Sequence, residues 1–264
     1  MFKTISIVQF IKPYYNKSMK YFWTHRDNIP EGYGYGQFTR KHFFLIAVTL
    51  LFIVGITCLY KNVEYAQRLI ILRSIGATLL IIDVIKLIVM SVTDVRVSDY
   101  LPLELCSFAA YAIVCDSISP ANDFFPEMLL TLFMPAALMA IMVPTTQPLP
   151  VFNFYTIHQF LFHGLIVGYV IARFAAGEIP ITFAGVWRSI PRIFILIVII
   201  YIFDCIFKKN YIFLRDPYGN PLLQIIWDKT GGGIKYVAGL SVFAVIVIHI
   251  FFLILKAIEL IFIH

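Results

Sequence analysis

Residues 42–60 read HFFLIAVTLLFIVGITCLY, a run without Lys, Arg, Asp or Glu. A run of this length matches the roughly 20 apolar residues that cross the ~30 Å hydrocarbon layer of a bilayer as a helix. Similar runs recur along the chain, and together they give seven predicted spans: 42–60, 68–92, 101–118, 126–143, 157–176, 192–207 and 236–263. The sequence therefore predicts an all-α, polytopic membrane protein with about seven transmembrane helices in one bundle.

The composition excludes a soluble domain. The chain has 264 residues, of which 60% are hydrophobic and 14% are charged, whereas soluble domains carry about 25% charged residues. The net charge of +6 comes from basic residues in loops beside the apolar runs, which is typical of membrane insertion and of contact with anionic headgroups. No basic face is left to bind a nucleic acid, so we expect no nucleic-acid partner.

The distribution of Lys and Arg predicts which side of the membrane each loop faces. With seven spans, the N-terminal tail shares one side with the loops after spans two, four and six. That side holds thirteen Lys and Arg residues against five on the other, which places the N-terminus in the cytoplasm of a multi-pass cell-membrane protein. We divide the chain into a basic, aromatic-rich cytoplasmic or interfacial segment, residues 1–41, and a transmembrane domain, residues 42–264. Residues 1–17 fit a short interfacial helix and a frayed tail equally well.

The third predicted span begins with polar residues. It opens LPLELCS at 101–107, which places a carboxylate, Glu104, two residues before a thiol, Cys106. Positions two apart in a regular helix point about 200° apart, so either the segment is not yet helical or only one of the two faces the bundle. Each residue also has a purely structural interpretation: Glu104 complements the dipole of a helix start, and Cys106 fills space.

The fifth predicted span carries His158, Gln159 and His163. The two histidines point about 140° apart on a helix, whereas Gln159 and His163 share a face. The histidines are therefore a poor ligand set for one metal, and the four cysteines show no CxxC spacing, so we expect no metal site and no cofactor. Histidine inside a span normally points into a bundle or a wet cavity. A functional role and a structural role are therefore about equally expected for these histidines.

The alternation of the spans predicts that these polar groups converge. The third and fifth spans begin on one side of the membrane, the first begins there too, and the sixth ends there. A thiol nucleophile needs a base and oxyanion donors within reach; His163 or His158 would supply the base, and Asn210 or Tyr211 the donors. The predicted catalytic residues are Cys106, His163, Glu104, His158 and Asn210, and the predicted substrate-binding residues are His42, Tyr211, Arg215 and Gln159.

Asp83 and Lys86 in the second predicted span give an alternative function. The pair is typical of a neutralising ion pair, but intramembrane charges also mark ion pathways. A small-solute or ion transporter built on Asp83, Lys86 and His249 is therefore the second hypothesis, although no internal repeat of the transporter kind is visible. A non-catalytic membrane scaffold is the third.

Several of these segments resemble a known family. The stretch HRDNIPEGYG at 25–34, followed by Phe38 and His42, is similar to the N-terminal segment of bacterial YwaF-type membrane proteins. LPLELC at 101–106, the histidine-bearing fifth span and NYIFL at 210–214 are similar to that group as well. The group is related to the transmembrane protein 164 family of integral membrane acyltransferases, and the resemblance covers nearly the whole chain after residue 20.

The resemblance implies a seven-span bundle that transfers acyl chains between lipids through a cysteine assisted by histidine. Cys106 matches the cysteine of an LPLHLC-like motif, His163 matches the histidine of the fifth span, and Glu104 stands where the motif has histidine. The leading hypothesis is a membrane-embedded acyltransferase or transacylase whose partner is a phospholipid or other acyl lipid. In it, Cys106 is the nucleophile, His163 the general base, Glu104 an orienting or second acid–base group, and Asn210 an oxyanion donor.

Overall fold

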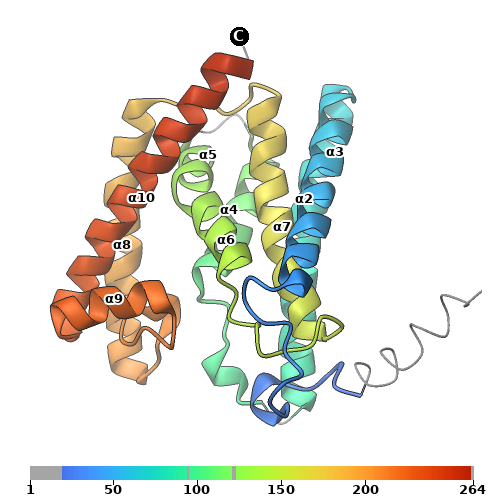
Figure 1. The fold of residues 1–264 in the computed structure, drawn as a ribbon. Coiled ribbons are helices and arrows are strands. Elements are labelled where there is room, and N and C mark those ends of the chain that lie inside the picture. The colour runs from blue at the N-terminus through green and yellow to red at the C-terminus, as the bar shows by residue number, and fades with distance from the viewer. Residues whose placement is uncertain (1–19, 94, 121–122, 263–264) are drawn as a thin grey trace, which may run out of the picture.

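The computed structural model describes residues 20–93, 95–120 and 123–262, and the predicted interfacial segment 1–17 lies outside them. The secondary structure in the described part of the chain is helical throughout. Long helices run up and down in alternation, as Figure 1 shows, and α9 (Pro221–Thr230) lies crosswise to them and packs against α10.

The described residues contain six helical segments that are long and apolar enough to cross a membrane. They are α2 (Arg40–Lys61), α3 (Tyr65–Val92), the continuous segment Phe124–Met142, α7 (Phe154–Ala175), α8 (Phe183–Phe207) and α10 (Gly233–Phe262). A shorter apolar helix, α4 (Leu105–Ile118), lies between the second and third of these in the sequence. The prediction of an all-α membrane protein with about seven spans is confirmed.

The exposed surface of the outer helices is apolar, as a lipid environment requires. In the most apolar window of α2, α8 and α10, only 17% of residues are buried inside the protein, compared with 67% in α7. Large side chains such as Leu51, Val54 and Ile199 are more than half exposed. Helix α7, which carries both histidines of the predicted site, is thus the central helix of the bundle.

The fourth span contains a local distortion. Helix α5 (Phe124–Met128) passes through a π-helical turn, η3 (Leu129–Phe133), into α6 (Met134–Met142). Pro135 lies directly after this turn. Proline has no N–H, and its ring clashes with the carbonyl four residues earlier, so Pro135 is expected to kink the helix. The wider π-helical turn accommodates the proline at this point.

Two features of the helix pattern differ from the prediction. Helix α8 begins at Phe183 rather than at residue 192, because Arg188 and Arg192 interrupt the apolar run without ending the helix. Both guanidinium groups form ion pairs with Glu127. Helix α9 was not predicted, because its ten residues are too few to form a span.

The segment before α2 docks against the connector that follows α6. The Tyr35 N–H donates to the Leu149 carbonyl at 2.9 Å. At Gly34 a side chain would not fit, because a Cβ there would lie 2.5 Å from the Gln147 carbonyl oxygen. The PEGYG stretch therefore packs its backbone directly onto the connector.

Candidate functional site

Three helices pack together at one end of the bundle: the C-terminal part of α3, the start of α4 and the first half of α7 (Figure 1). The loop after α8 contacts the residues that precede α4. Seven side chains in this region form a group that we call the polar cluster: Asp83, Lys86, Glu104, Cys106, Ser107, His158 and His163. They come from α3, from α4 and the residue before it, and from α7.

Helix α4 starts in a way that exposes backbone donors beside Cys106. Glu104 has an extended backbone (φ −74°, ψ 156°), so the helix begins at Leu105, and the Glu104 side chain does not cap it. The N–H groups of Leu105 and Cys106 donate to no residue in the described part of the chain. The Ser107 N–H donates to the Glu104 carbonyl at 3.0 Å and also lies close to the Cys106 sulfur. The thiol therefore lies at the positive end of a helix dipole, and the segment is not yet helical at Glu104.

Asp83 joins α3 to the first turn of α4. The Ser107 hydroxyl donates to Asp83 Oδ2 at 3.2 Å, and the Lys86 ammonium forms an ion pair with Asp83 Oδ1. The Asp83 and Lys86 side chains are 6% and 15% exposed. The ammonium is thus held inside the protein rather than extended toward water.

The two histidines of α7 differ in their hydrogen bonding. His163 Nδ1 lies 2.6 Å from the Gln159 carbonyl, which requires the hydrogen on Nδ1 and leaves a lone pair on Nε2. The His158 ring stacks on Phe162 with centroids 5.2 Å apart, and its Nε2 is buried without a hydrogen-bond partner among the described residues. The Gln159 amide donates to the Ala140 carbonyl at 3.1 Å, so it fastens α7 to α6.

Four predicted site residues lie within the electrostatic range of the Lys86 ammonium. They are Glu104, Cys106, His158 and His163. In the described structure no hydrogen bond joins Cys106 to either imidazole. The sequence interpretation did not include Lys86 or Ser107 in this site. Two features of the sequence could have placed them there. Ser107 directly follows Cys106, and Asp83 and Lys86 lie toward the end of their span that faces the start of the third span.

Asn210 and Arg215 build the loop after α8. The Asn210 side-chain oxygen accepts from the N–H groups of Arg215 (2.8 Å) and Asp216 (3.1 Å), and its amide donates to the Asp216 carbonyl (2.9 Å). The Arg215 guanidinium donates to the carbonyls of Asp204 (3.0 Å) and Lys209 (3.3 Å) at the end of α8. The Asn210 side chain is thus engaged with the backbone of its own loop, and the Arg215 side chain joins this loop to the end of α8.

The LPLELC and NYIFL motifs contact each other. The Tyr211 hydroxyl donates to the Ser98 carbonyl at 3.0 Å and accepts from the Leu101 N–H at 3.2 Å. Burial raises the pKa of the Tyr211 phenol, so the group stays protonated as a donor. Glu104 Oε2 accepts from the Ile212 N–H at 3.2 Å, and Ile212 has a φ of 55°, which is strained for a β-branched residue. Glu104 therefore holds a strained turn against the start of α4.

His42 lies outside the polar cluster. Its Nε2 donates to the Ile141 carbonyl at 2.9 Å, and its Nδ1 accepts from the Phe38 N–H at 3.0 Å. The side chain is fully buried. Both ring nitrogens bind the backbone, so His42 fastens the start of α2 to the end of α6.

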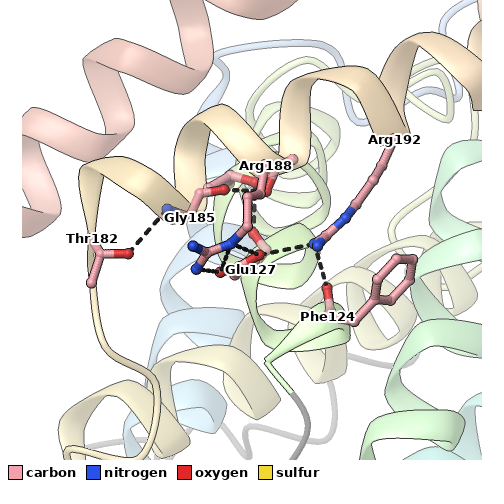
Figure 2. Close-up of polar contacts among 8 residues, drawn as sticks. Phe124, Glu127, Thr182, Gly185, Arg188 and Arg192 are labelled. Atoms are coloured by element: carbon pink, nitrogen blue, oxygen red, sulfur yellow. Dashed lines mark hydrogen bonds and ion pairs between the residues drawn. The ribbon is translucent and has the colours of Figure 1, made fainter.

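A second group of charged side chains joins α5 to the start of α8 (Figure 2). Glu127 of α5 is buried and accepts hydrogen bonds from Arg188 and Arg192 of α8, the latter at 2.9 Å. Thr182 caps α8 by accepting from the Gly185 N–H at 3.0 Å. Gly185 permits this packing, because a Cβ there would lie 3.1 Å from a Glu127 carboxylate oxygen. This group fixes the first turns of α8 against α5.

The fold and the polar cluster together define a multi-pass helical membrane protein with a partly buried thiol at the start of one of its helices. A family model described as the TMEM164 family matches residues 37–255. The chain belongs to that family. The match spans α2 through most of α10 and includes every residue of the polar cluster. Comparisons with curated proteins and with solved structures found no match.

Proposed function

We propose that the protein is a membrane-embedded acyltransferase or transacylase that uses Cys106 as its nucleophile and an acyl lipid as its donor. The observation that supports this most is the position of Cys106 on the first turn of α4. There the sulfur lies beside helix amides without described partners and within the electrostatic reach of Lys86. Both features oppose the cost of placing a thiolate away from water.

The reaction would proceed in two steps. In the first, His163 Nε2 accepts the thiol proton, the sulfur attacks the ester carbonyl carbon, and a C–S bond forms as the ester C–O bond breaks. The departing alcohol takes the proton from His163. In the second, an acceptor hydroxyl gives its proton to His163 and attacks the thioester, the new ester C–O bond forms as the C–S bond breaks, and the released sulfur takes the proton back from His163. Catalytic hydrogen bonds often close only when substrate is bound.

The backbone amides of Leu105 and Cys106 are the proposed oxyanion donors. They replace Asn210 in this role, because the Asn210 amide is engaged within its own loop. Preorganised donors of this kind contribute about 3–4 kcal/mol each to transition-state stabilisation. His158 is the proposed second acid–base or substrate-binding group, since its buried Nε2 lacks a described partner and such groups in native proteins call for an explanation.

Lipid profiling of membranes with matched protein levels tests the proposal. Cys106→Ser and His163→Gln should each abolish the change in acyl distribution that the parent protein produces. Cys115→Ser and His249→Gln, which alter the same residue types elsewhere in the bundle, should preserve it. Unchanged acyl profiles in both site variants would refute the proposal.

The transporter hypothesis makes a different prediction about Asp83. In a transporter, Asp83→Asn would abolish uptake of a solute by proteoliposomes. The contacts of Asp83 favour acyl transfer instead, because its two oxygens bind Lys86 and Ser107 beside Cys106. We further propose, from the loop charges, that the N-terminus and the polar cluster face the cytoplasmic side of the cell membrane.

A further inference from the structure

We propose that Lys86 is a positioning residue for the nucleophile: its ammonium, held by the Asp83 carboxylate that Ser107 also binds, stabilises the thiolate of Cys106. This inference rests on the proposed function for its biological meaning. Its test is a property of the thiol alone.

The charges around the sulfur show why a cation is needed. A thiolate removed from water is costly unless an opposite charge or hydrogen bonds compensate it. The carboxylates of Glu104 and Asp83 carry the same negative charge as a thiolate and repel it, whereas the Lys86 ammonium attracts it. Without Lys86, the side-chain charges that act on the sulfur would all oppose its ionisation.

The histidines of α7 do not replace this cation. Both His158 and His163 lie within the electrostatic range of the Lys86 ammonium. A second positive charge on either ring would be repelled by it. A neutral His163 is also the form that can accept the thiol proton.

The position of the ammonium is fixed from two helices. A lysine side chain in a span would otherwise extend toward the interface. Asp83, three residues earlier on α3, forms the ion pair, and Ser107 hydrogen-bonds the same carboxylate from α4. Ser107 is adjacent to Cys106, so the carboxylate that holds the ammonium is itself attached to the turn that carries the thiol.

Alkylation kinetics of Cys106 measure the effect directly. The other cysteines, Cys58, Cys115 and Cys205, are exposed and would be replaced by Ala in the full-length protein. The protein in lipid nanodiscs would be treated with iodoacetamide at pH 8, and the labelling of Cys106 followed by mass spectrometry. Lys86→Met should slow alkylation by about tenfold or more, since a nearby opposite charge shifts an ionisation equilibrium by roughly 1–3 pH units. Lys86→Arg should restore most of the rate.

A matched control uses the same kind of pair elsewhere. Lys256 forms an i,i+3 ion pair with Glu259 at 2.5 Å near the end of α10. Lys256→Met should leave the alkylation of Cys106 unchanged. An unfolded Lys86→Met protein would expose Cys106 and react faster, so a slower rate cannot arise from unfolding.

Two results would overturn the inference: equal alkylation rates in the parent and Lys86→Met, or no labelling of Cys106 in the parent. Because the assay contains no turnover, its failure is separate from failure of the acyl-transfer proposal. If the lipid profiles do not respond to Cys106→Ser while the alkylation effect holds, the proposed function is wrong and the Lys86–thiolate interaction remains.

Discussion

The buried ion pair between Asp116 and Arg173 provides the sharpest stability test. It joins α4 to α7, the helices that carry Cys106 and His163. Arg173 is 2% exposed, and Asp116 is fully buried. The guanidinium also donates to Glu178 at 3.2 Å and to the Pro120 carbonyl at 3.0 Å. Replacing Arg173 with Met leaves the Asp116 carboxylate with only the Tyr169 hydroxyl, at 2.5 Å, among the partners described for it.

Breaking a buried pair from one side typically costs about 3–5 kcal/mol, because it leaves an uncompensated charge. We expect Arg173→Met to lose that amount in reversible unfolding in detergent micelles. Arg173→Met combined with Asp116→Asn should recover part of the loss, since the stranded charge is then gone. Arg188→Met is the matched control: its side chain is 52% exposed and its partner Glu127 keeps Arg192, so its loss should be clearly smaller. Equal losses in Arg173→Met and Arg188→Met would refute the reasoning.

Three further predictions concern individual contacts. Glu104→Gln should keep most of the lipid turnover, because an amide oxygen can still accept from the Ile212 N–H, whereas Glu104→Ala should lower turnover several-fold; equal activities would contradict the role of this bond. His42→Phe should reduce the free energy of unfolding by about 1–3 kcal/mol through two lost hydrogen bonds, while turnover per folded molecule stays the same. In a chain without its native cysteines, Lys209→Cys should react with an impermeant maleimide only from the cytoplasmic side and Lys61→Cys only from the outside; the reverse pattern would invert the topology.

The spans could be predicted because lipid imposes a simple requirement on sequence. A segment must be apolar over about 20 residues, and this is visible locally. The start of α8 could not be predicted in the same way. Arg188 and Arg192 resemble a loop when read alone, and their partner Glu127 lies more than sixty residues earlier. Their ion pairs let two guanidinium groups remain inside a helix, and only the tertiary structure shows that partner.

The site was predictable in position but not in its contacts. Alternation of the spans placed Cys106 and the histidines toward one end, and in the structure all three lie within the electrostatic range of Lys86. Spacing along one helix could not show that Lys86 faces residues of α4 and α7, because such contacts depend on helix rotation. Nor could it show that the Asn210 amide is used within its own loop, since that depends on the left-handed turns at 212–213.

The depth of the polar cluster bears on which substrate it fits. Helix α2 has 22 residues and rises about 33 Å, close to the ~30 Å hydrocarbon thickness. Helix α3 returns from the far end, and Asp83 lies about 27 Å along it from Tyr65, which puts Asp83 within roughly 6 Å of the level at which α2 begins. On α7, Phe160 packs on His42 near that same level, with ring centroids 5.9 Å apart.

Ser107 binds Asp83, and Phe160 lies between His158 and His163 in the sequence. We therefore expect the thiol and both imidazoles near the edge of the hydrocarbon layer. A transported solute would be expected to bind near the midplane. The ester groups of a glycerolipid join its headgroup to its acyl chains and therefore lie at this edge. The depth of Cys106 thus favours an acyl ester as the group that meets the sulfur.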